Sequence, residues 1–244
     1  MSKYRRIVNS NFILDDVDPK VFVSEVSVNQ LQDKLIVVGI HITTLNALIS
    51  GTLNTGEFKR ADLVYADGVS VSLLGKLFGL NKFQRLAMTD LIRLFLDAHS
   101  DSAPFKVALL GGENFVSDLA AKNWKLRYPE DSVWSHHGYE TNWTPILEDL
   151  RYFAPDLVLV GLGMPLELRF LNDHYEELPK AIYFTCGGYL RLLAGVEKRA
   201  PKLFQEVKLE WLYRLVFSPK RTFSRYSRGV WTLLKYGSLA IRDK

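Results

Sequence analysis

The sequence predicts an α/β fold: a Rossmann-like, mostly parallel sheet flanked by helices, followed by a C-terminal helical basic appendage. Three observations support this prediction. Short apolar runs recur along the body of the chain, most of them end in small or glycine-bearing turns, and helical patterns lie between them. Strands that alternate with helices in this way form βαβ units with parallel strands.

The apolar runs are short and almost uniformly apolar, as expected of strands that a parallel sheet buries on both faces. They are Leu35–Ile42, Leu63–Ala66, Phe105–Leu110, Ser132–Ser135, Leu157–Val160 and Ala181–Thr185. The turns after them are Ala66–Gly68, Leu110–Gly112, His137–Tyr139, Val160–Gly163 and Cys186–Gly188. In such folds the ligand binds beyond the carboxyl ends of the strands, where glycines let the backbone approach it and helix N-termini attract phosphate. The turns therefore predict a nucleotide-binding edge of the sheet.

Helical patterns follow several of these turns. They cover Thr89–Ala98, Asn114–Arg127 and Pro145–Phe153. After Gly161 and Gly163, Pro165 is interpreted as the first residue of a further helix, a position that tolerates its missing N–H. This region lacks the third glycine of the dinucleotide-binding fingerprint, and no GxxxxGK[ST] loop occurs in the chain. The predicted nucleotide site therefore belongs to neither of these two motif classes.

The composition limits the class of protein. With 244 residues and 48% apolar content, the chain forms one domain, or one domain with an appendage. It has no run of eighteen apolar residues and no signal-peptide pattern at Met1–Ile7, so we expect neither a membrane span nor secretion. The single cysteine, Cys186, excludes an internal disulfide and a multi-cysteine zinc site, and it agrees with a reducing cytoplasm. No cofactor is expected.

The charge divides the chain into two parts. Residues 191–244 carry thirteen Lys and Arg against four Asp and Glu, whereas residues 1–190 carry eighteen against twenty-three. We therefore predict a Rossmann-like α/β domain over residues 1–205 and a basic aromatic appendage over residues 206–244.

The appendage is expected to be helical and to bind a polyanion, a phosphorylated ligand or an anionic membrane. From Thr222 onward, apolar and basic side chains recur on separate faces, as in helices that lie on lipid headgroups. Three alternatives stay open: a solvated basic helix, a helix whose apolar face packs on the body, and a nucleic-acid binder. The last one leaves the glycine-bearing turns unexplained, so we expect no nucleic-acid partner.

Asp67 is the carboxylate best placed for chemistry, because it ends an apolar run and precedes Gly68. A carboxylate at the ligand-binding edge can act as a general base. A helix cap is the alternative interpretation of the same residue. Asp62, which opens the same run, is interpreted as a turn or surface residue. Cys186 is interpreted as a buried small hydrophobe rather than a nucleophile.

Metal binding is not predicted. Asp15–Asp18 superficially matches the DxD pattern with which many glycosyltransferases hold a metal, but it lies in a polar N-terminal stretch before Pro19 rather than after a strand. The five histidines show neither HxxxH nor HExxH spacing. His136 and His137 end a strand, and we interpret them either as ligand-binding residues or as a structural pair.

Several of these segments together resemble the bacterial WecG/TagA/CpsF glycosyltransferase family, from about Val38 to Tyr226. The segments that carry the resemblance are Thr44–Asn46, Ala61–Gly68, Arg85–Leu91, Leu110–Gly112, His137–Tyr139, Gly161–Pro165, Arg199–Pro201, Leu209–Leu215 and Pro219–Arg221. Their shared order and spacing are highly specific. Arg85–Leu91 resembles the family's R-x-T-G-x-D-L, with Ala87 and Met88 in place of Thr and Gly.

The resemblance implies that residues 1–205 form a catalytic domain that transfers a sugar from a UDP-sugar to a saccharide carried on a polyprenyl diphosphate. In the family this reaction inverts the anomeric centre, needs no bound metal and serves envelope or extracellular polysaccharide synthesis. It takes place at the cytoplasmic face of the membrane. The implied location is therefore cytoplasmic and peripheral, on the anionic inner membrane surface that the appendage, residues 206–244, would contact while it completes the active site. A homo-oligomer is left open.

The resemblance also implies roles for individual residues. Asp67 becomes the base that deprotonates the acceptor hydroxyl. Arg214, Arg221 and Arg225 of the appendage would lie near the diphosphate, where guanidinium groups stabilise the departing UDP. The remaining substrate-binding residues are Thr44, Asn46, Gly68, Arg85, Asp90, Gly111, Gly112, His137, Gly138, Tyr139, Gly161, Gly163, Pro165 and Glu167.

Glu167 is the main departure from the family pattern, because it replaces a glutamine that is expected to touch the ligand in the motif G-x-P-K-Q-E. An acid beside a diphosphate is unfavourable unless it binds a sugar hydroxyl instead. This change leaves the donor sugar open. It also supports the alternative of an inactive module that binds a nucleotide or a lipid phosphate.

Overall fold

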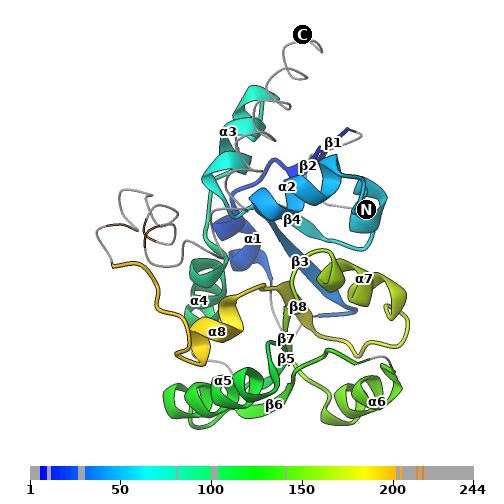
Figure 1. The fold of residues 1–244 in the computed structure, drawn as a ribbon, viewed down its shortest axis with the longest axis vertical. Coiled ribbons are helices and arrows are strands. Elements are labelled where there is room, and N and C mark those ends of the chain that lie inside the picture. Colours follow the sequence, from blue (N-terminus) through cyan, green and yellow to red (C-terminus); the bar gives the residue numbers. More distant parts are fainter. Residues whose placement is uncertain are drawn as a thin grey trace.

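The computed structural model describes residues 6–9, 12–26, 31–80, 82–99, 104–140 and 142–201, together with Phe204, Tyr213 and Val216. Its centre is a six-stranded sheet in the order β4-β3-β8-β7-β5-β6, in which all neighbouring strands are parallel (Figure 1). The strands are β3 (Leu35–Ile40), β4 (Leu63–Ala66), β5 (Lys106–Gly111), β6 (Ser132–His136), β7 (Leu157–Gly161) and β8 (Ile182–Thr185). Each coincides with a predicted apolar run, so the predicted α/β fold is confirmed.

Helices cover both faces of the sheet and form a hydrophobic core on each side (Figure 1). The helices of one face are α2 (Ile42–Ile49), α3 (Val69–Leu77), α6 (Thr144–Phe153) and α7 (Leu166–Asp173). The helices of the other face are α1 (Pro19–Glu25), α4 (Met88–Ala98), α5 (Asn114–Arg127) and α8 (Tyr189–Leu193). A short 3₁₀ helix, η2 (Thr55–Phe58), precedes β4. The three predicted helical patterns correspond to α4, α5 and α6.

Two predicted boundaries are wrong by a few residues. The strand expected over Leu35–Ile42 ends at Ile40, because the capping box of His41 and Thr44 starts α2 at Ile42. Pro165 is the N-cap of α7 rather than its first residue, since helical geometry begins at Leu166. Both errors arise where a turn is very short, so that apolar residues of a strand and of a helix follow one another almost directly.

The N-terminal segment forms an antiparallel hairpin of β1 (Arg6–Asn9) and β2 (Phe12–Asp15), which the sequence analysis did not predict. Asp15 therefore ends a buried strand, and the interpretation of this stretch as polar and as not following a strand is wrong. Its Oδ2 accepts a hydrogen bond from the Val64 amide at 2.7 Å. Asp16 accepts the amide of Lys82, and Asp18 caps α1. Asp15 thus joins the hairpin to β4, Asp16 joins it to the segment between α3 and α4, and Asp18 caps α1, so the apparent DxD pattern has structural roles.

Aspartates also close the edge of the sheet at which the strands begin. Asp62 accepts the Ile36 amide at 2.8 Å, Asp131 accepts the Phe105 amide at 2.9 Å, and Asp156 accepts the Lys106 amide at 2.8 Å. In each case an acid just before one strand binds a backbone amide within one residue of the start of the neighbouring strand. Asp62 is exposed, as predicted, but it also has this pairing role.

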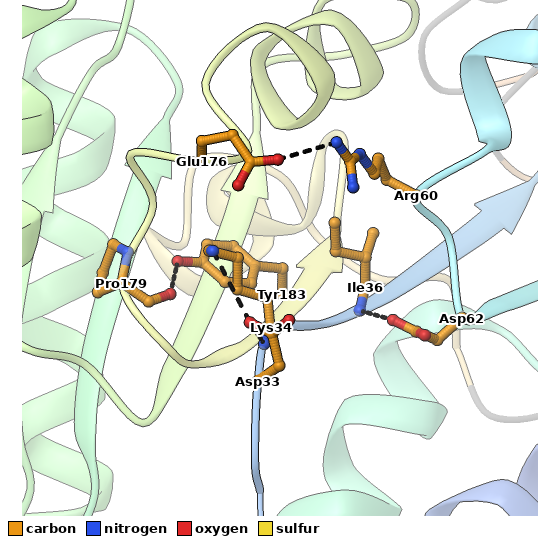
Figure 2. A network of polar contacts seen from close by, with 8 residues as sticks. All are labelled: Asp33, Lys34, Ile36, Arg60, Asp62, Glu176, Pro179 and Tyr183. Carbon is orange, nitrogen blue, oxygen red and sulfur yellow. Dashed lines mark hydrogen bonds and ion pairs between the residues drawn. The ribbon is translucent and has the colours of Figure 1, made fainter. Parts of the chain in front are cut away.

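Side-chain contacts strengthen the same edge near β3 and β8, as Figure 2 shows. Arg60 forms an ion pair with Glu176 at 2.9 Å, and Tyr183 Oη donates to the Pro179 carbonyl at 2.6 Å. The guanidinium of Arg60 also lies 4.0 Å from the ring centre of Tyr175. The amino ends of the strands are therefore tied together by satisfied polar groups.

Of the predicted appendage, the structure describes Tyr213 and Val216, which are both helical. The ring centroid of Tyr213 lies 5.5 Å from that of Phe204. The division of the chain near residue 205 stays a prediction, because the rest of the appendage lies outside the described residues. Among the residues that the structure describes, no helix combines the length and the apolar character needed to cross a bilayer.

Candidate active site

The glycine-bearing turns meet at the carboxyl edge of the sheet, as predicted. A Cβ added to Gly111 would come within 2.4 Å of the Gly161 carbonyl carbon, and one on Gly161 would lie 3.0 Å from the Gly187 carbonyl oxygen. A Cβ on Gly138 would lie 2.7 Å from the side chain of Leu162. The turns after β5, β6, β7 and β8 therefore pack directly on one another. Close approach of backbone to backbone, which only glycine allows, is the reason for these residues.

Asp67 lies in the turn after β4 and is half-buried. Its backbone amide donates to the Ile40 carbonyl at 3.0 Å, which places the turn beside the end of β3. Its Oδ1 accepts the amide of Met88, the first residue of α4, at 3.1 Å. The alternative that Asp67 caps the next helix is wrong, because that helix, α3, has Gly68 as its N-cap and no side-chain cap. Asp67 instead binds the first amide of α4, and this contact holds the carboxylate at the edge where the prediction placed a general base.

Thr44 and Asn46 lie on α2, directly after β3 and next to the Asp67 turn. The Thr44 side chain is buried, and its Oγ1 accepts the His41 amide at 3.4 Å. Asn46 lies two residues further along α2 and is half-buried. A Cβ on Gly68 would lie 3.8 Å from the Cα of His41, so the turns after β3 and β4 are adjacent.

Arg85 belongs to the segment that leads from α3 to α4. The amide of the next residue, Leu86, donates to the Ala66 carbonyl at 3.2 Å. The segment therefore passes the end of β4, and the half-buried Arg85 lies on the same stretch of chain that supplies Met88 to Asp67.

Asp90, in the first turn of α4, forms a bidentate ion pair with Arg199. Its two carboxylate oxygens accept from the guanidinium at 2.9 and 2.8 Å. The sequence analysis assigned Asp90 to substrate binding and quoted Arg199 only as part of a motif. The pairing of two residues so far apart in the sequence has no local signal that could have revealed it.

His136 and His137 stack after β6, with ring centroids 4.5 Å apart. Nδ1 of each ring accepts a backbone amide hydrogen, from Gly138 at 3.0 Å and from Tyr139 at 3.1 Å. This pattern puts the ring hydrogen of each neutral imidazole on Nε2. Burial lowers the pKa of His136, and the neighbouring His137 lowers it further. His136 therefore presents an Nε2–H donor at this edge, while Tyr139 is exposed.

Glu140 joins the two histidines in a cluster of three candidate metal ligands, whose ligand atoms lie within 4.8 Å of one another. His137 Nε2 lies 3.2 Å from Glu140 Oε1. Both nitrogens of the His137 ring are thus used by protein groups, and a neutral imidazole that accepts at Nδ1 has no second lone pair for a metal. The tautomer that the backbone selects favours hydrogen bonding over metal ligation at this cluster.

Glu167 is buried at the start of α7 and points to the backbone of two turns. Its Oε1 accepts the Gly163 amide at 3.0 Å and the Gly187 amide at 2.7 Å. Burial raises the pKa of Glu167 to about 7, although the two amide hydrogen bonds act in the opposite direction. Near neutral pH the acid is therefore uncharged more often than an ordinary glutamate, so the conflict between an acid and a diphosphate is weaker than the sequence suggested.

Two further buried groups lie at this point of the sheet. Burial raises the pKa of the Cys186 thiol, and nearby Glu167 raises it further, which agrees with the prediction of an unreactive cysteine. The Tyr65 hydroxyl is buried and has no hydrogen-bond partner among the described residues. A Cβ on Gly39 would lie 3.0 Å from Tyr65 Oη, so the absence of a side chain at Gly39 lets the ring of Tyr65, on β4, lie over β3. The sequence analysis did not single out Tyr65.

A separate open cleft of about 480 Å³ lies between η2 and α7. It is lined by Asn54, Gly56, Glu57, Lys59, Arg169, Asn172 and Asp173. Arg169 and Asn172 donate to the Thr52 and Glu57 carbonyls at 2.8 and 2.6 Å. None of the predicted site residues lines this cleft. We locate the candidate site at the carboxyl edge because Asp67, the predicted base, and the glycine-bearing turns lie there. Arg214, Arg221 and Arg225 lie outside the described residues.

Comparison with known proteins gives two results. A sequence profile described as the "Glycosyl transferase WecG/TagA/CpsF family" matches residues 13–243. Curated relatives from Staphylococcus aureus strains NCTC 8325, COL and MRSA252 are named N-acetylglucosaminyldiphosphoundecaprenol N-acetyl-beta-D-mannosaminyltransferase. Each is 34% identical over 117 residues, a match that covers 48% of this chain and 46% of the relative. The chain thus spans about half the length of the curated relatives it matches.

Proposed function

This chain belongs to the WecG/TagA/CpsF glycosyltransferase family, and from that premise we propose that it transfers a sugar from a UDP-sugar to a saccharide carried on a polyprenyl diphosphate. The anomeric carbon is inverted in the proposed reaction. The observation that carries the proposal is the position of Asp67, which the Met88 amide holds at the carboxyl edge beside the glycine-bearing turns. The name of the relatives supports a lipid-linked acceptor, and it supports N-acetylmannosamine as the first sugar to test.

In the proposed mechanism, Asp67 accepts the proton of the acceptor hydroxyl. The hydroxyl oxygen forms a bond to the anomeric carbon while the bond from that carbon to the diphosphate oxygen breaks, and UDP leaves with the electron pair. Negative charge develops on the departing diphosphate, where fixed cations stabilise it. Arg85 is the candidate cation within the described carboxyl edge. Arg214, Arg221 and Arg225 keep this role as a prediction.

We also propose that the protein works at the cytoplasmic face of the membrane, attached peripherally through residues 206–244. Each Lys or Arg near an anionic surface contributes about 1 kcal/mol to membrane binding. The full chain is therefore expected to sediment with vesicles that contain phosphatidylglycerol and to stay in solution with pure phosphatidylcholine. Equal binding to both vesicle types would contradict the electrostatic attachment.

The test of the reaction is UDP release from a panel of UDP-sugars, including UDP-N-acetylmannosamine, with and without a short-chain prenyl-diphosphate-linked N-acetylglucosamine in detergent. The proposal expects release that depends on the acceptor and occurs with one donor. Mass spectrometry of the lipid product then identifies the transferred sugar, and the anomeric configuration of the product checks inversion. UDP binding without release by any donor would instead support the inactive binding module.

A further inference from the structure

One side-chain oxygen links two turns of the candidate site. Oε1 of Glu167 accepts the amide of Gly163 in the β7–α7 turn (Leu162–Pro165) and the amide of Gly187 in the β8–α8 turn (Cys186–Gly188). The Glu167 backbone amide also donates to the Gly163 carbonyl at 3.2 Å, so Glu167 binds its own turn from both sides. The contact with Gly187 is the shorter of the two side-chain bonds, at 2.7 Å.

The geometry of both turns depends on these bonds. Gly163 has φ +81° and Gly187 has φ +47°, a region that glycine enters easily and other residues rarely adopt. Because glycine is equally free to leave that region, a turn built on it needs an external contact to hold one conformation. The Glu167 carboxyl supplies the same contact to both turns. A movement of one turn therefore shifts the oxygen that binds the other turn.

Among the described groups that shift the pKa of Glu167, none is a cation. Burial and the two glycine amides are the causes that act on it. Its charge in turn acts on Cys186, which follows β8, and on Tyr65, which lies on β4. The charge of Asp67 also acts on Tyr65. The carboxyl is thus a buried acid committed to backbone amides rather than to an ion pair.

We propose that Glu167 is a positioning residue that couples the β7–α7 turn to the β8–α8 turn, so that a nucleoside diphosphate bound at one turn orders the other. The identity of the ligand rests on the proposed function. The coupling itself rests on the two hydrogen bonds to one oxygen. The family's glutamine and the glutamate of this chain both carry a side-chain oxygen that can accept the two amides. We therefore expect the coupling to need the oxygen and not the charge.

Three variants separate coupling from general stability. Glu167→Gln keeps a carbonyl oxygen for both amides, whereas Glu167→Leu removes the acceptor at similar size. Asp131→Leu is the matched control at the opposite edge of the sheet. Asp131 is also a buried acid that joins two elements, through the Phe105 amide at 2.9 Å and Trp124 Nε1 at 2.8 Å.

The measurement is hydrogen–deuterium exchange of the peptides that contain Gly163 and Gly187, in the full chain with and without UDP. In the wild type and in Glu167→Gln, UDP is expected to slow exchange at both turns. In Glu167→Leu, exchange without ligand is expected to rise at least tenfold at both turns, and UDP is expected to slow it at one of them only. Asp131→Leu is expected to keep the joint response despite lower stability.

A joint response of both turns in Glu167→Leu, with exchange equal to that of the wild type, overturns the proposal. If UDP fails to bind the wild type, the proposed donor is wrong, yet exchange without ligand still decides the coupling. If Glu167→Leu does not fold, the exchange experiment on Glu167→Gln decides it: loss of the joint response to UDP in this variant contradicts a role that needs only the oxygen. A retained joint response supports the proposal.

Discussion

The two edges of the sheet use carboxylates in different ways. At the amino edge, Asp62, Asp131 and Asp156 each bind an amide within one residue of the start of a neighbouring strand. At the carboxyl edge, one oxygen of Glu167 serves two glycine turns, and the Tyr65 hydroxyl has no partner among the described residues. Carboxylates at the amino edge therefore join neighbouring strands, whereas the carboxyl edge joins turns and holds a buried hydroxyl that makes no hydrogen bond within the described part of the chain, a departure from ordinary core packing that is typical of functional sites.

The largest effect is expected from Asp67→Asn, which keeps the shape of the side chain but removes its ability to accept a proton. The rate of sugar transfer should fall by about 100- to 10,000-fold, the usual contribution of a general base. UDP affinity, measured by calorimetry, should change little. Asp62→Asn is the control at the amino edge, and it should leave the rate per folded molecule intact. Equal rates for Asp67→Asn and the wild type would remove Asp67 from the mechanism.

A large loss of stability is expected from Asp131→Ala at the amino edge. The change leaves the Phe105 amide and the Trp124 indole N–H without their acceptor, and each buried donor of this kind costs about 1–3 kcal/mol. The free energy of unfolding in urea should therefore fall by about 3–4 kcal/mol. UDP affinity of the folded fraction should stay unchanged. A loss of affinity without a loss of stability would show that the two edges are not functionally distinct.

The stability of the wild type should depend on pH through Glu167. Its pKa in the folded protein is about 7, above the ordinary value of 4.5, so the folded state holds a proton that the unfolded chain releases. This contribution is fully present below pH 4.5, is lost as the pH rises to about 7, and amounts to about 3 kcal/mol.

Glu167→Gln removes this titration. Denaturation in urea at a series of pH values should give an unfolding free energy that rises relative to the wild type between pH 4.5 and about 7 and then stays at a constant difference. A difference between the two proteins that is independent of pH would contradict the raised pKa.

The smallest effects are expected from a pair of tyrosines on opposite edges. Tyr65→Phe removes a buried hydroxyl that has no partner among the described residues, so it should raise the free energy of unfolding by about 1 kcal/mol. Tyr183→Phe removes the donor that binds the Pro179 carbonyl at 2.6 Å, so this change should lower the free energy of unfolding by about 1 kcal/mol. Thermal unfolding of both variants shows whether each change stabilises or destabilises the protein. Destabilisation by both changes would mean that Tyr65 is an ordinary core residue.

Local patterns predicted most of the fold. The uniformly apolar runs at Leu63–Ala66 and Leu157–Val160 match strands β4 and β7, which helices cover on both faces, because such strands need apolar side chains on both sides. The hairpin that contains β2 was missed, since Asp15 and Asp16 make the segment appear polar. Both carboxylates are buried against backbone amides, and these partners lie elsewhere in the sequence.

The candidate site was predictable in its location but not in its contacts. The order of strand, Asp67 and Gly68 indicates a carboxylate at a strand end, and the glycine turns indicate the same edge. The path of the chain through space brings Met88 to Asp67 and Arg199 to Asp90. Residue type alone could not reveal these partners.

The sequence by itself determined the class of each segment and the edge of the sheet where chemistry can occur, because hydrophobic periodicity and turn residues act over a few neighbouring positions. Only the tertiary structure decided what each polar group does. Glu167 looks like an acid placed against a ligand when it is considered within its motif. In the fold it is buried, holds two amides and has its pKa raised to about 7, because burial and the approach of Gly187 depend on the packing of β7 beside β8.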